Sequence, residues 1–323
     1  MYTNNTGISL PLQIWLASDD YDHINDPTYI SATSLLKSTR SLVLSKRLPP
    51  NQIIDLSDLI ASRMGTAIHD SIEKAWKKPE GSLRALGYPE QVFKNVYLNP
   101  TAENLRHDPN IIPIYMELRN IKEINGFKIG GKFDFVADNT LHDFKSTGTY
   151  TYITGSNDEK YVQQGSIYRW LNQDIITSDH MFIEFIFTDW SYVKALADKS
   201  YPQSKVLSKK YNLMSIAETE NFIKNKLDKI IKYMNADQDQ IPQCTPEELW
   251  QSAPTWKYYR DPNKTTRATK NFDTPTEAYK RLSDDGNKGI VVQVDGEAKA
   301  CRYCSARSIC TQAEQLELKG LLK

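Results

Sequence analysis

The chain has 323 residues, of which 40% are hydrophobic and 25% are charged. This composition is typical of a soluble globular protein with enough length for one large domain or two ordinary ones. Lys plus Arg balances Asp plus Glu at 40 each, which argues against polyanion binding through net charge alone, although a local basic groove is compatible with neutrality. No apolar run reaches membrane-spanning length and no basic segment precedes an apolar one at the N-terminus, so we expect a cytoplasmic protein without a signal peptide.

The N-terminal part predicts an extended arm followed by a helix. Residues 1–29 are mostly polar, with an apolar patch at Ile14-Trp15-Leu16. A helix is expected over Ser31–Arg47, because Ser31 or Thr33 can cap it and apolar residues follow with helical spacing. Pro49-Pro50 should end this helix.

A second helix is predicted from Ser57 or Asp58 to Trp76. Its apolar positions form a stripe that we expect to be buried, namely Leu59, Ile60, Met64, Ile68, Ile72 and Trp76. Gly65 inside a helix costs about 1 kcal/mol relative to alanine, so we expect another backbone to approach closely there. His69 lies one turn further on the same side. Taken alone, such a histidine is more often an ordinary partnered residue than a metal ligand.

The middle of the chain predicts strands and helices in alternation. The expected elements, in chain order, are an irregular stretch at 79–110 with a helical fragment, a strand over Ile111–Ile121 that contains Glu117, a turn over Glu123–Phe127, hairpin strands Lys128–Ala137 and Leu141–Ser146, a loop at 147–157, a helix over Asp158–Asn172, a buried strand over Met181–Phe187, a basic loop over Pro202–Lys210, and a helix over Ser215–Asn235 whose Ser215 and Glu218 have capping-box spacing.

The hairpin carries the most informative chemistry of the chain. Asp138-Asn139 tolerates the positive φ of a two-residue turn. The register that follows pairs Ala137 with Thr140, Val136 with Leu141, Phe135 with His142 and Asp134 with Asp143. Directly opposed side chains lie about 4.5–5.5 Å apart, so the two carboxylates should repel unless a cation lies between them. Lys145 shares the face of Asp143, and this set suits a hard divalent metal and a phosphate substrate.

The hairpin resembles the core motif of the PD-(D/E)xK nuclease superfamily, with Asp134 as the first acid and Asp143-Phe144-Lys145 as D-x-K. Three further features occur in the order found in RecB-like members: Gly131 before the first acid, Gly65 and His69 on an upstream helix, and Gln164 with Tyr168 one turn apart on the following helix. The chain departs from the motif in lacking a proline before Asp134 and in having Asp as the second acid.

The resemblance implies a fold, an activity and a set of site residues. The fold would be α/β, a restriction-endonuclease-like core with a mixed central sheet flanked by helices. The activity would be Mg²⁺- or Mn²⁺-dependent hydrolysis of DNA phosphodiester bonds. The implied metal ligands are His69, Asp134, Asp143 and the backbone carbonyl of Phe144, and Glu117 is either a further ligand or a surface acid. Lys145 would orient the attacking water and offset developing charge. The resemblance also implies that Gln164 and Tyr168 position the nucleotide or the helix.

The four cysteines, Cys244, Cys301, Cys304 and Cys310, all lie in the last third of the chain. In a cytoplasmic chain such residues are metal ligands or free thiols. Structural zinc sites usually pair two close Cys knuckles, whereas one distant cysteine here joins three clustered ones. This asymmetry fits a [4Fe-4S] cluster, with Zn²⁺ as the alternative. The C-x2-C-x5-C spacing also resembles that of the cluster that holds the C-terminal segment in AddB-like and CRISPR-adaptation nucleases. Those relatives place the fourth ligand before the helical histidine, where this chain has no cysteine, so Cys244 would replace it.

The expected organisation is an N-terminal arm at 1–30, a nuclease core at 31–240 and a C-terminal cysteine-cluster subdomain at 241–323. The resemblance extends to phage-encoded exonucleases, which implies a role in DNA recombination, replication or repair in the host cytoplasm and a single-strand annealing protein as partner. The alternatives are an endonuclease of the same superfamily, a non-catalytic DNA-binding module, and a structural or regulatory protein whose metal site serves only to fold the C-terminus. Basic residues proposed for the DNA track are Lys205–Lys210, Lys264–Lys270, Arg302 and Arg307.

Overall fold

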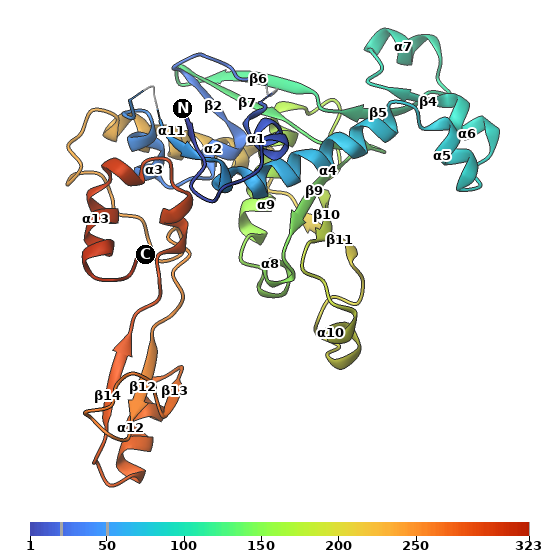
Figure 1. The fold of residues 1–323 in the computed structure, drawn as a ribbon. Helices are drawn as coiled ribbons and strands as arrows, with labels where there is room; N and C mark the ends of the chain where they lie inside the picture. Colours follow the sequence, from blue (N-terminus) through green and yellow to red (C-terminus); the bar gives the residue numbers. More distant parts are fainter. Residues whose placement is uncertain (20–21, 50–51, 323) are drawn as a thin grey trace. The chain divides into compact units, whose positions relative to one another are not determined.

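The computed structural model describes residues 1–19, 22–49 and 52–322, which form two compact units (Figure 1). The first unit comprises Met1–Leu36 and Pro50–Leu227, and the second comprises Lys37–Pro49 and Asp228–Lys323. The second unit therefore includes a short segment from the N-terminal part of the chain. The three-part division expected from the sequence stays a prediction. Pro50, expected to help end a helix, lies outside the described residues.

The first unit is a mixed α/β structure, as predicted. The strands of its two main sheets are β2 (Tyr29–Ser31), β4 (Val96–Leu98), β5 (Ile112–Met116), β6 (Arg119–Ile124), β7 (Phe127–Lys132), β8 (Phe135–Ala137), β9 (Thr140–Thr147), β10 (His180–Phe187) and β11 (Val206–Asn212). One sheet has the order β11-β10-β9-β8-β5-β4 and the other has the order β2-β7-β6. In the six-stranded sheet β4 is parallel to β5 and β9 to β10, whereas the other neighbours are antiparallel.

Helices flank these sheets. In the first unit they are α1 (Leu10–Ala17), α2 (Ala32–Leu35), the 3-10 helix η1 (Leu56–Leu59), α4 (Ile60–Trp76), α5 (Glu80–Ala85), α6 (Glu90–Asn95), α7 (Ala102–His107), α8 (Thr149–Thr154), α9 (Asp158–Leu171) and α10 (Tyr192–Ala197), and α11 (Ile216–Tyr233) begins in the same unit. The short strands β1 (Tyr2–Thr3) and β3 (Ile54–Asp55) pair in parallel. Helix α4 packs on β9, and α9 packs on β6, β7 and β9, so these two helices and strand β9 position the candidate site.

The predicted hairpin turn is confirmed. Asp138 and Asn139 have φ values of 47° and 55°, as a two-residue turn between twisted strands requires. The ladder pairs Ala137 with Thr140, Val136 with Leu141 and Phe135 with His142. It ends there, because Asp134 lies in a bend before β8 and has no ladder partner. The predicted direct pairing of Asp134 with Asp143 is therefore not part of the sheet.

The predicted strand Lys128–Ala137 is wrong in one respect, because it belongs to two sheets. Strand β7 ends at Lys132 in the three-stranded sheet, and β8 begins at Phe135 in the six-stranded sheet. Phe133, which is fully buried, and Asp134 form the crossing. An alternating pattern of apolar residues does not reveal such a change of sheet, since both strands bury the same kinds of side chains.

The predicted strand Ile111–Ile121 is also divided. Strand β5 ends at Met116 and β6 begins at Arg119, and Glu117 between them has a left-handed φ of 53°. The turn expected over Glu123–Phe127 is tighter than predicted, since β6 continues to Ile124 and only Asn125-Gly126 separate it from β7.

Two helix predictions need correction. The helix expected over Ser31–Arg47 is two helices, α2 and α3 (Thr39–Ser45), because Ser38 provides a second N-cap by accepting a hydrogen bond from the Ser41 N–H at 3.1 Å. The stripe expected on the second helix is not buried. None of the residues of α4 is fully buried, and Ile60 and Met64 are 40% and 47% exposed.

Regions predicted as loops contain regular structure. Short helices α5, α6 and α7 and strand β4 occupy the stretch 79–110, and α8 lies in the predicted loop 147–157. The basic loop Pro202–Lys210 contains most of edge strand β11, which pairs with β10. Lys209 in this strand forms an ion pair with Asp158 at 2.7 Å. The positive charge of this lysine is therefore partly compensated by a neighbouring carboxylate. The capping box of α11 is confirmed, since Ser215 and Glu218 exchange hydrogen bonds.

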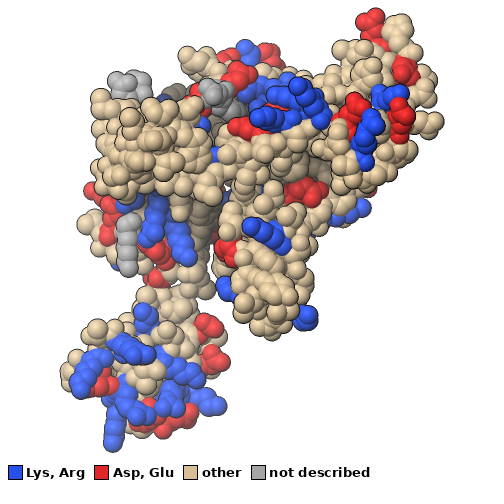
Figure 2. Space-filling view, turned by 45° about the vertical axis from the view of Figure 1, so that its right-hand side comes forward, with Lys and Arg blue, Asp and Glu red and all other residues tan. Residues whose placement is uncertain are grey.

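The second unit combines α3 and the end of α11 with C-terminal elements. These are β12 (Thr255–Tyr259), β13 (Lys270–Phe272), α12 (Pro275–Asp284), β14 (Ile290–Val294), the 3-10 helices η2 (Lys299–Tyr303) and η3 (Arg307–Ile309), and α13 (Thr311–Leu318). Strands β13-β12-β14 form an antiparallel sheet that packs against α12. Figure 2 shows Lys and Arg side chains gathered on this module, in a chain whose formal net charge is zero. In the described part of the chain, no helix is both long and apolar enough to span a bilayer.

Candidate active site and candidate metal centre

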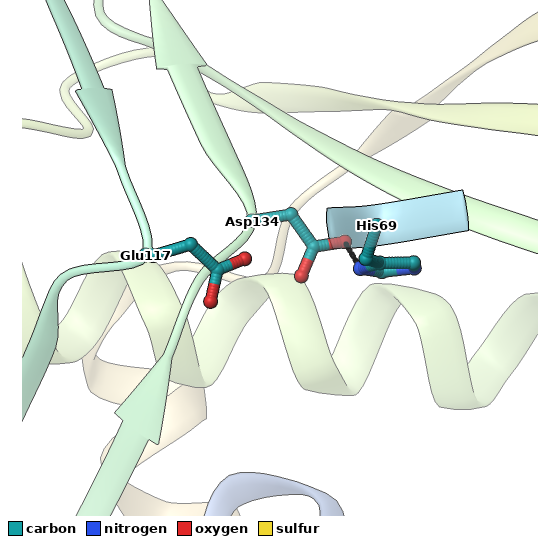
Figure 3. Close-up of side chains that lie close together, drawn as sticks. All are labelled: His69, Glu117 and Asp134. Atoms are coloured by element: carbon teal, nitrogen blue, oxygen red, sulfur yellow. Dashed lines mark ion pairs between the residues drawn. The ribbon is translucent and has the colours of Figure 1, made fainter. Parts of the chain in front are cut away.

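Three potential metal ligands meet in the first unit. His69 comes from α4, Glu117 from the link between β5 and β6, and Asp134 from the bend before β8 (Figure 3). One ligand atom from each lies within 4.8 Å of the others. All three residues were candidates from the sequence, with Glu117 as either a further metal ligand or a surface acid. A nitrogen and two carboxylate oxygens at this separation fit one divalent cation of the Mn²⁺ or Mg²⁺ type.

The backbone holds Glu117 in an unusual conformation. A left-handed φ in a residue other than glycine costs about 1–2 kcal/mol and is common at functional sites. The Glu117 N–H donates to the carbonyl oxygen of Asp134 at 3.3 Å, so the two acidic residues are tied through their main chains. The Glu117 carboxylate also forms an ion pair with Lys132. This arrangement turns the side chain toward Asp134 (Figure 3).

The two hairpin carboxylates occupy an environment that favours a bound cation. Asp143 on β9 is only 2% exposed, and its Oδ1 has no hydrogen-bond partner in the part of the chain that the structure describes. Asp134 accepts a hydrogen bond from the Phe144 N–H at 2.9 Å. Burial, and then the negative charge of Asp143, raise the pKa of Asp134 well above its usual value. A cation would remove this mutual repulsion and give the unsatisfied oxygen a partner.

Lys145 supplies positive charge beside these carboxylates. It forms an ion pair with Oδ2 of Asp143, and its side chain is 25% exposed. Burial alone would lower the pKa of Lys145, but the charges of Asp143 and Asp134 outweigh burial and raise it. Lys145 therefore stays protonated and can act as a fixed cation. Its Nζ also lies 5.9 Å from the ring centre of Tyr161.

His69 is oriented by the hairpin. Its Nε2 lies 3.0 Å from the carbonyl oxygen of Phe144, and its Nδ1 lies 3.6 Å from Oδ2 of Asp134. The Phe144 carbonyl, which the resemblance implied as a metal ligand, thus contacts His69 in this structure. Because a carbonyl oxygen has two lone pairs, this contact leaves the second one for another partner.

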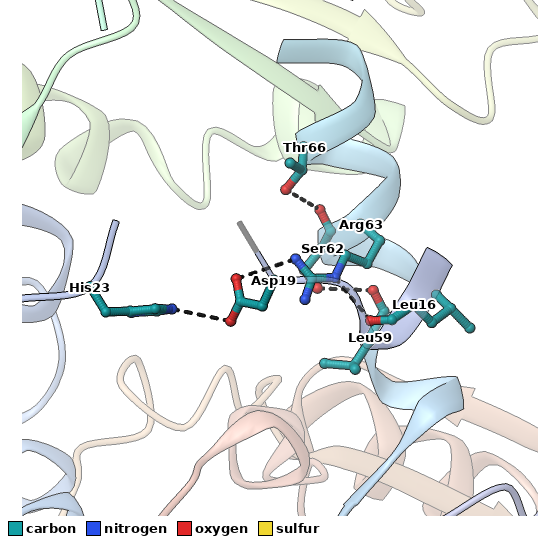
Figure 4. Close-up of polar contacts among 7 residues, drawn as sticks. All are labelled: Leu16, Asp19, His23, Leu59, Ser62, Arg63 and Thr66. Atoms are coloured by element: carbon teal, nitrogen blue, oxygen red, sulfur yellow. Dashed lines mark hydrogen bonds and ion pairs between the residues drawn. The ribbon is translucent and has the colours of Figure 1, made fainter. Parts of the chain in front are cut away.

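A cleft of about 500 Å³ opens at this site, entirely within the first unit. The ligand trio and Lys132 form part of its wall, together with Gly65 and Asp70 of α4 and residues of the N-terminal arm that include Trp15 and Asp22. Arg63 attaches the arm to α4, since it donates to the carbonyl oxygen of Leu16 at 3.0 Å and lies 3.6 Å from Asp19 (Figure 4).

The sequence did not assign Trp15, Arg63 or Lys132 to the site. Lys132 carried a signal that could have been used, because it stands two residues before Asp134. Trp15 lies in helix α1, so the expectation of an extended arm is wrong there. Arg63 lies on α4, and its contacts with Leu16 and Asp19 join residues 44 or more positions apart, which the sequence pattern does not reveal.

Gly65 has a different role from the one expected. A Cβ added there would meet only Oγ of Ser146, at 3.5 Å, which is ordinary van der Waals contact. Among the described residues, no backbone atom of another element lies within 4 Å of this Cβ, so the expected close approach is wrong. Gly131 has the crowded position instead, because an added Cβ would lie 2.7 Å from the ring of Tyr168.

Gln164 and Tyr168 lie inside the first unit. Both are buried, at 9% and 4% exposure, and Gln164 Nε2 donates to the Tyr168 hydroxyl at 2.9 Å. Since Tyr168 packs on Gly131, this pair joins α9 to β7 close to the bend that holds Asp134. Their surroundings favour positioning of the site rather than direct contact with a nucleotide.

The four cysteines lie together in the second unit. Cys244, Cys301, Cys304 and Cys310 line one small cavity and are free thiols in the structure. Burial, and then the proximity of the other three cysteines, raise the pKa of Cys301 to about 11, and burial raises the pKa of Cys244. Four sulfurs around a single cavity fit a metal centre with four thiolate ligands.

Comparisons with known proteins leave the family open. No protein-family model and no curated protein matches the chain. Among solved structures, the protein SSO0001 is 15% identical with a TM-score of 0.40, and the match covers 67% of this chain and 83% of that one. A phage-related exonuclease from Haemophilus somnus 129PT is also 15% identical, with a TM-score of 0.26 and coverage of 62% and 93%. At these scores neither likeness carries an argument, so the functional inference rests on the residues of the site.

Proposed function

We propose that the chain is a divalent-metal-dependent nuclease that hydrolyses DNA phosphodiester bonds from an end. The observation that supports this most is the meeting of His69, Glu117 and Asp134 beside buried Asp143 and Lys145. The choice of DNA, of an exonuclease and of a single-strand annealing partner comes from the motif resemblance.

The residues fit a cation of the Mg²⁺ or Mn²⁺ type. Asp134, Glu117 and His69 would hold it, and Asp143 would share its charge. When bound, such a cation polarises a phosphoryl oxygen and makes a coordinated water more acidic. Its hard character matches the oxygen-rich ligand set.

The chain's own residues supply the remaining functions. The Lys145 ammonium, held by Asp143, would offset negative charge that develops on the scissile phosphate and orient the attacking water. Lys132 would keep the Glu117 carboxylate turned toward the site. Gln164 and Tyr168 would fix the bend of Asp134 through Gly131.

In the second unit, the same proposal places a [4Fe-4S] cluster on the four cysteines, with Zn²⁺ as the alternative. Such a centre would stabilise the unit, because metal binding energy contributes to folding energy where the ligands come from distant parts of the chain.

The test is degradation of linear and closed-circular DNA, in double- and single-stranded forms, with Mg²⁺, Mn²⁺ or a chelator. We expect metal-dependent loss of the linear forms and persistence of the circular ones. Cleavage of circular DNA would favour the endonuclease. Lys145→Met should lower kcat by about 10²–10³-fold.

The matched control for this variant is Lys128→Met. Lys128 is also a strand lysine paired with a carboxylate, that of Asp26 at 2.9 Å, and it does not line the cleft. Full activity in purified, folded Lys145→Met protein would contradict the proposed active site.

A further inference from the structure

The cysteine cavity has a buried cation in its wall. Arg40 of α3 is 3% exposed, and its contacts in the described part of the chain involve no carboxylate. Nε lies 3.3 Å from Sγ of Cys310, Nη1 donates to the carbonyl oxygens of Gln238 and Ile241 at 3.0 Å each, and Nη2 donates to Oγ1 of Thr311 at 2.8 Å.

A buried guanidinium normally has an anionic partner, because removing a charge from water is unfavourable unless another charge compensates it. The second arginine of this wall, Arg307, has a side chain that is 36% exposed, and it still pairs with a carboxylate, that of Glu317 at 2.7 Å. Arg40 has only neutral partners while the cysteines are thiols. Deprotonated cysteines would provide the missing negative charge.

Two hydroxyl groups from the same segment also face sulfur atoms. Oγ of Ser38 lies 3.2 Å from Sγ of Cys244, and Oγ of Ser41 lies 3.4 Å from Sγ of Cys304. A thiolate can only accept hydrogen bonds, so both hydroxyls would become donors to it. Residues 38–41 thus direct polar groups at three of the four cysteines.

We propose that the segment Ser38–Ser41 is the charge-compensating wall of an anionic four-thiolate metal centre, with Arg40 as its counter-ion. This inference rests on the proposed cysteine centre and deepens it. Positive charge and hydrogen bonds to the sulfurs stabilise the more negative, reduced form of an iron–sulfur cluster, so they raise its reduction potential. Arg40 is a positioning residue here, and its effect is on potential and metal retention.

The experiment compares anaerobically purified full-length wild-type protein with Arg40→Gln, Arg40→Lys and Arg47→Gln. Arg47 is the matched control because it lies two residues after the end of α3 and donates to the carbonyl oxygens of Tyr233, Met234 and Ala236, with no sulfur among its contacts in the described part of the chain. The readouts are iron and zinc per chain, the midpoint potential from a redox titration followed by electron paramagnetic resonance, and the rate of metal release to a chelator.

We expect Arg40→Gln to lower the midpoint potential by an amount that changes the ratio of reduced to oxidised cluster at least tenfold, about 59 mV for one electron. It should also release metal at least tenfold faster. Arg40→Lys should keep most of the wild-type potential, and Arg47→Gln should leave it unchanged. If Arg40→Gln does not fold, Ser38→Ala and Ser41→Ala should each lower the potential by a smaller amount.

The outcomes separate this inference from the proposed centre. Metal-free wild-type protein would overturn the centre itself and the counter-ion with it. A metal-loaded wild type whose potential and metal release do not differ from those of Arg40→Gln, or of both serine variants, would overturn the counter-ion alone. If the bound metal is zinc, faster zinc release from Arg40→Gln than from Arg47→Gln supports the inference, and equal rates overturn it.

Discussion

Nε2 of His69 lies 3.0 Å from the backbone carbonyl oxygen of Phe144. A carbonyl oxygen only accepts hydrogen bonds, so the ring proton belongs on Nε2. In the neutral ring this leaves the lone pair on Nδ1, the nitrogen 3.6 Å from Asp134. The hairpin backbone therefore selects the tautomer of His69 that can bind a cation next to Asp134.

Replacing His69 should weaken cation binding. We expect His69→Asn to raise the Kd for Mn²⁺ by at least about tenfold, because it removes both the ligand nitrogen and its orienting contact. Calorimetric titration of Mn²⁺ into metal-free protein measures this change. His107→Asn is the control, since His107 is an exposed histidine outside the cleft. Equal affinities in both variants would remove His69 from the metal site.

The two glycines near the site should respond differently to alanine. In Gly131→Ala, the new methyl group would lie 2.7 Å from the Tyr168 ring, so we expect a loss of about 1–3 kcal/mol in the free energy of unfolding. Gly65→Ala meets only ordinary contact and lies within a helix, so it should keep or raise stability, by up to about 1 kcal/mol. Urea unfolding of both variants provides the comparison. A stable Gly131→Ala protein would show that Tyr168 does not fix this part of β7.

The left-handed conformation of Glu117 should be measurable as strain. Glu117→Gly and Glu117→Ala remove the same side-chain contacts, but only glycine adopts a φ of 53° without penalty. We expect the glycine variant to be more stable than the alanine variant by about 1 kcal/mol. Both should bind Mn²⁺ more weakly than the wild type. An alanine variant as stable as the glycine variant would argue against strain at this position.

Acid should reduce the contribution of Glu184 to stability. The hydrogen bond from His142, and a further one from Ser208, hold the pKa of Glu184 below its usual value of about 4.5, against the opposite effect of burial. An acid with a lowered folded-state pKa stabilises the protein above its unfolded-state pKa and loses this contribution as the pH falls through the folded-state value.

The variant Glu184→Gln tests this dependence. At pH 7 its Tm should lie below that of the wild type, and the difference should shrink once the pH falls below about 4.5. The melting temperatures of both proteins across this range measure the effect. A difference in Tm that stays constant from pH 7 to pH 3 would show that the charge of the Glu184 carboxylate does not contribute to stability.

The features that could be predicted are those that depend on local chemistry. The Asp138-Asn139 turn and the capping box of Ser215 and Glu218 are specified by a few adjacent residues, and both are present in the structure. The spacing of Asp134 and Asp143 around that turn was enough to place both acids near Lys145. The turn determines the register of β8 and β9, so the proximity of these three residues could be predicted from the sequence.

The remaining features depend on contacts between distant residues. The bend at Asp134 exists because β7 and β8 belong to different sheets, and the conformation of Glu117 follows from a similar change between β5 and β6. Side-chain alternation is the same on both sides of such a crossing. The apolar stripe of α4 was mispredicted because helical spacing shows which residues share a face but not whether another element covers that face; Ile60 and Met64 are 40% and 47% exposed. The burial of Arg40 could not be predicted from its own helix, because its partners lie up to 271 positions away.

The contact between Arg40 and Thr311 also has a consequence for the order of folding. During synthesis the segment Lys37–Pro49 emerges early, yet the partners that bury Arg40 leave the ribosome only when residues 238–311 have been translated. Closing a loop of this length carries a high entropic barrier, which slows formation of such contacts. The same delay applies to the apolar residues of this segment, because Val43 and Leu44 pack with Ile241 and Ala306, which are also translated late.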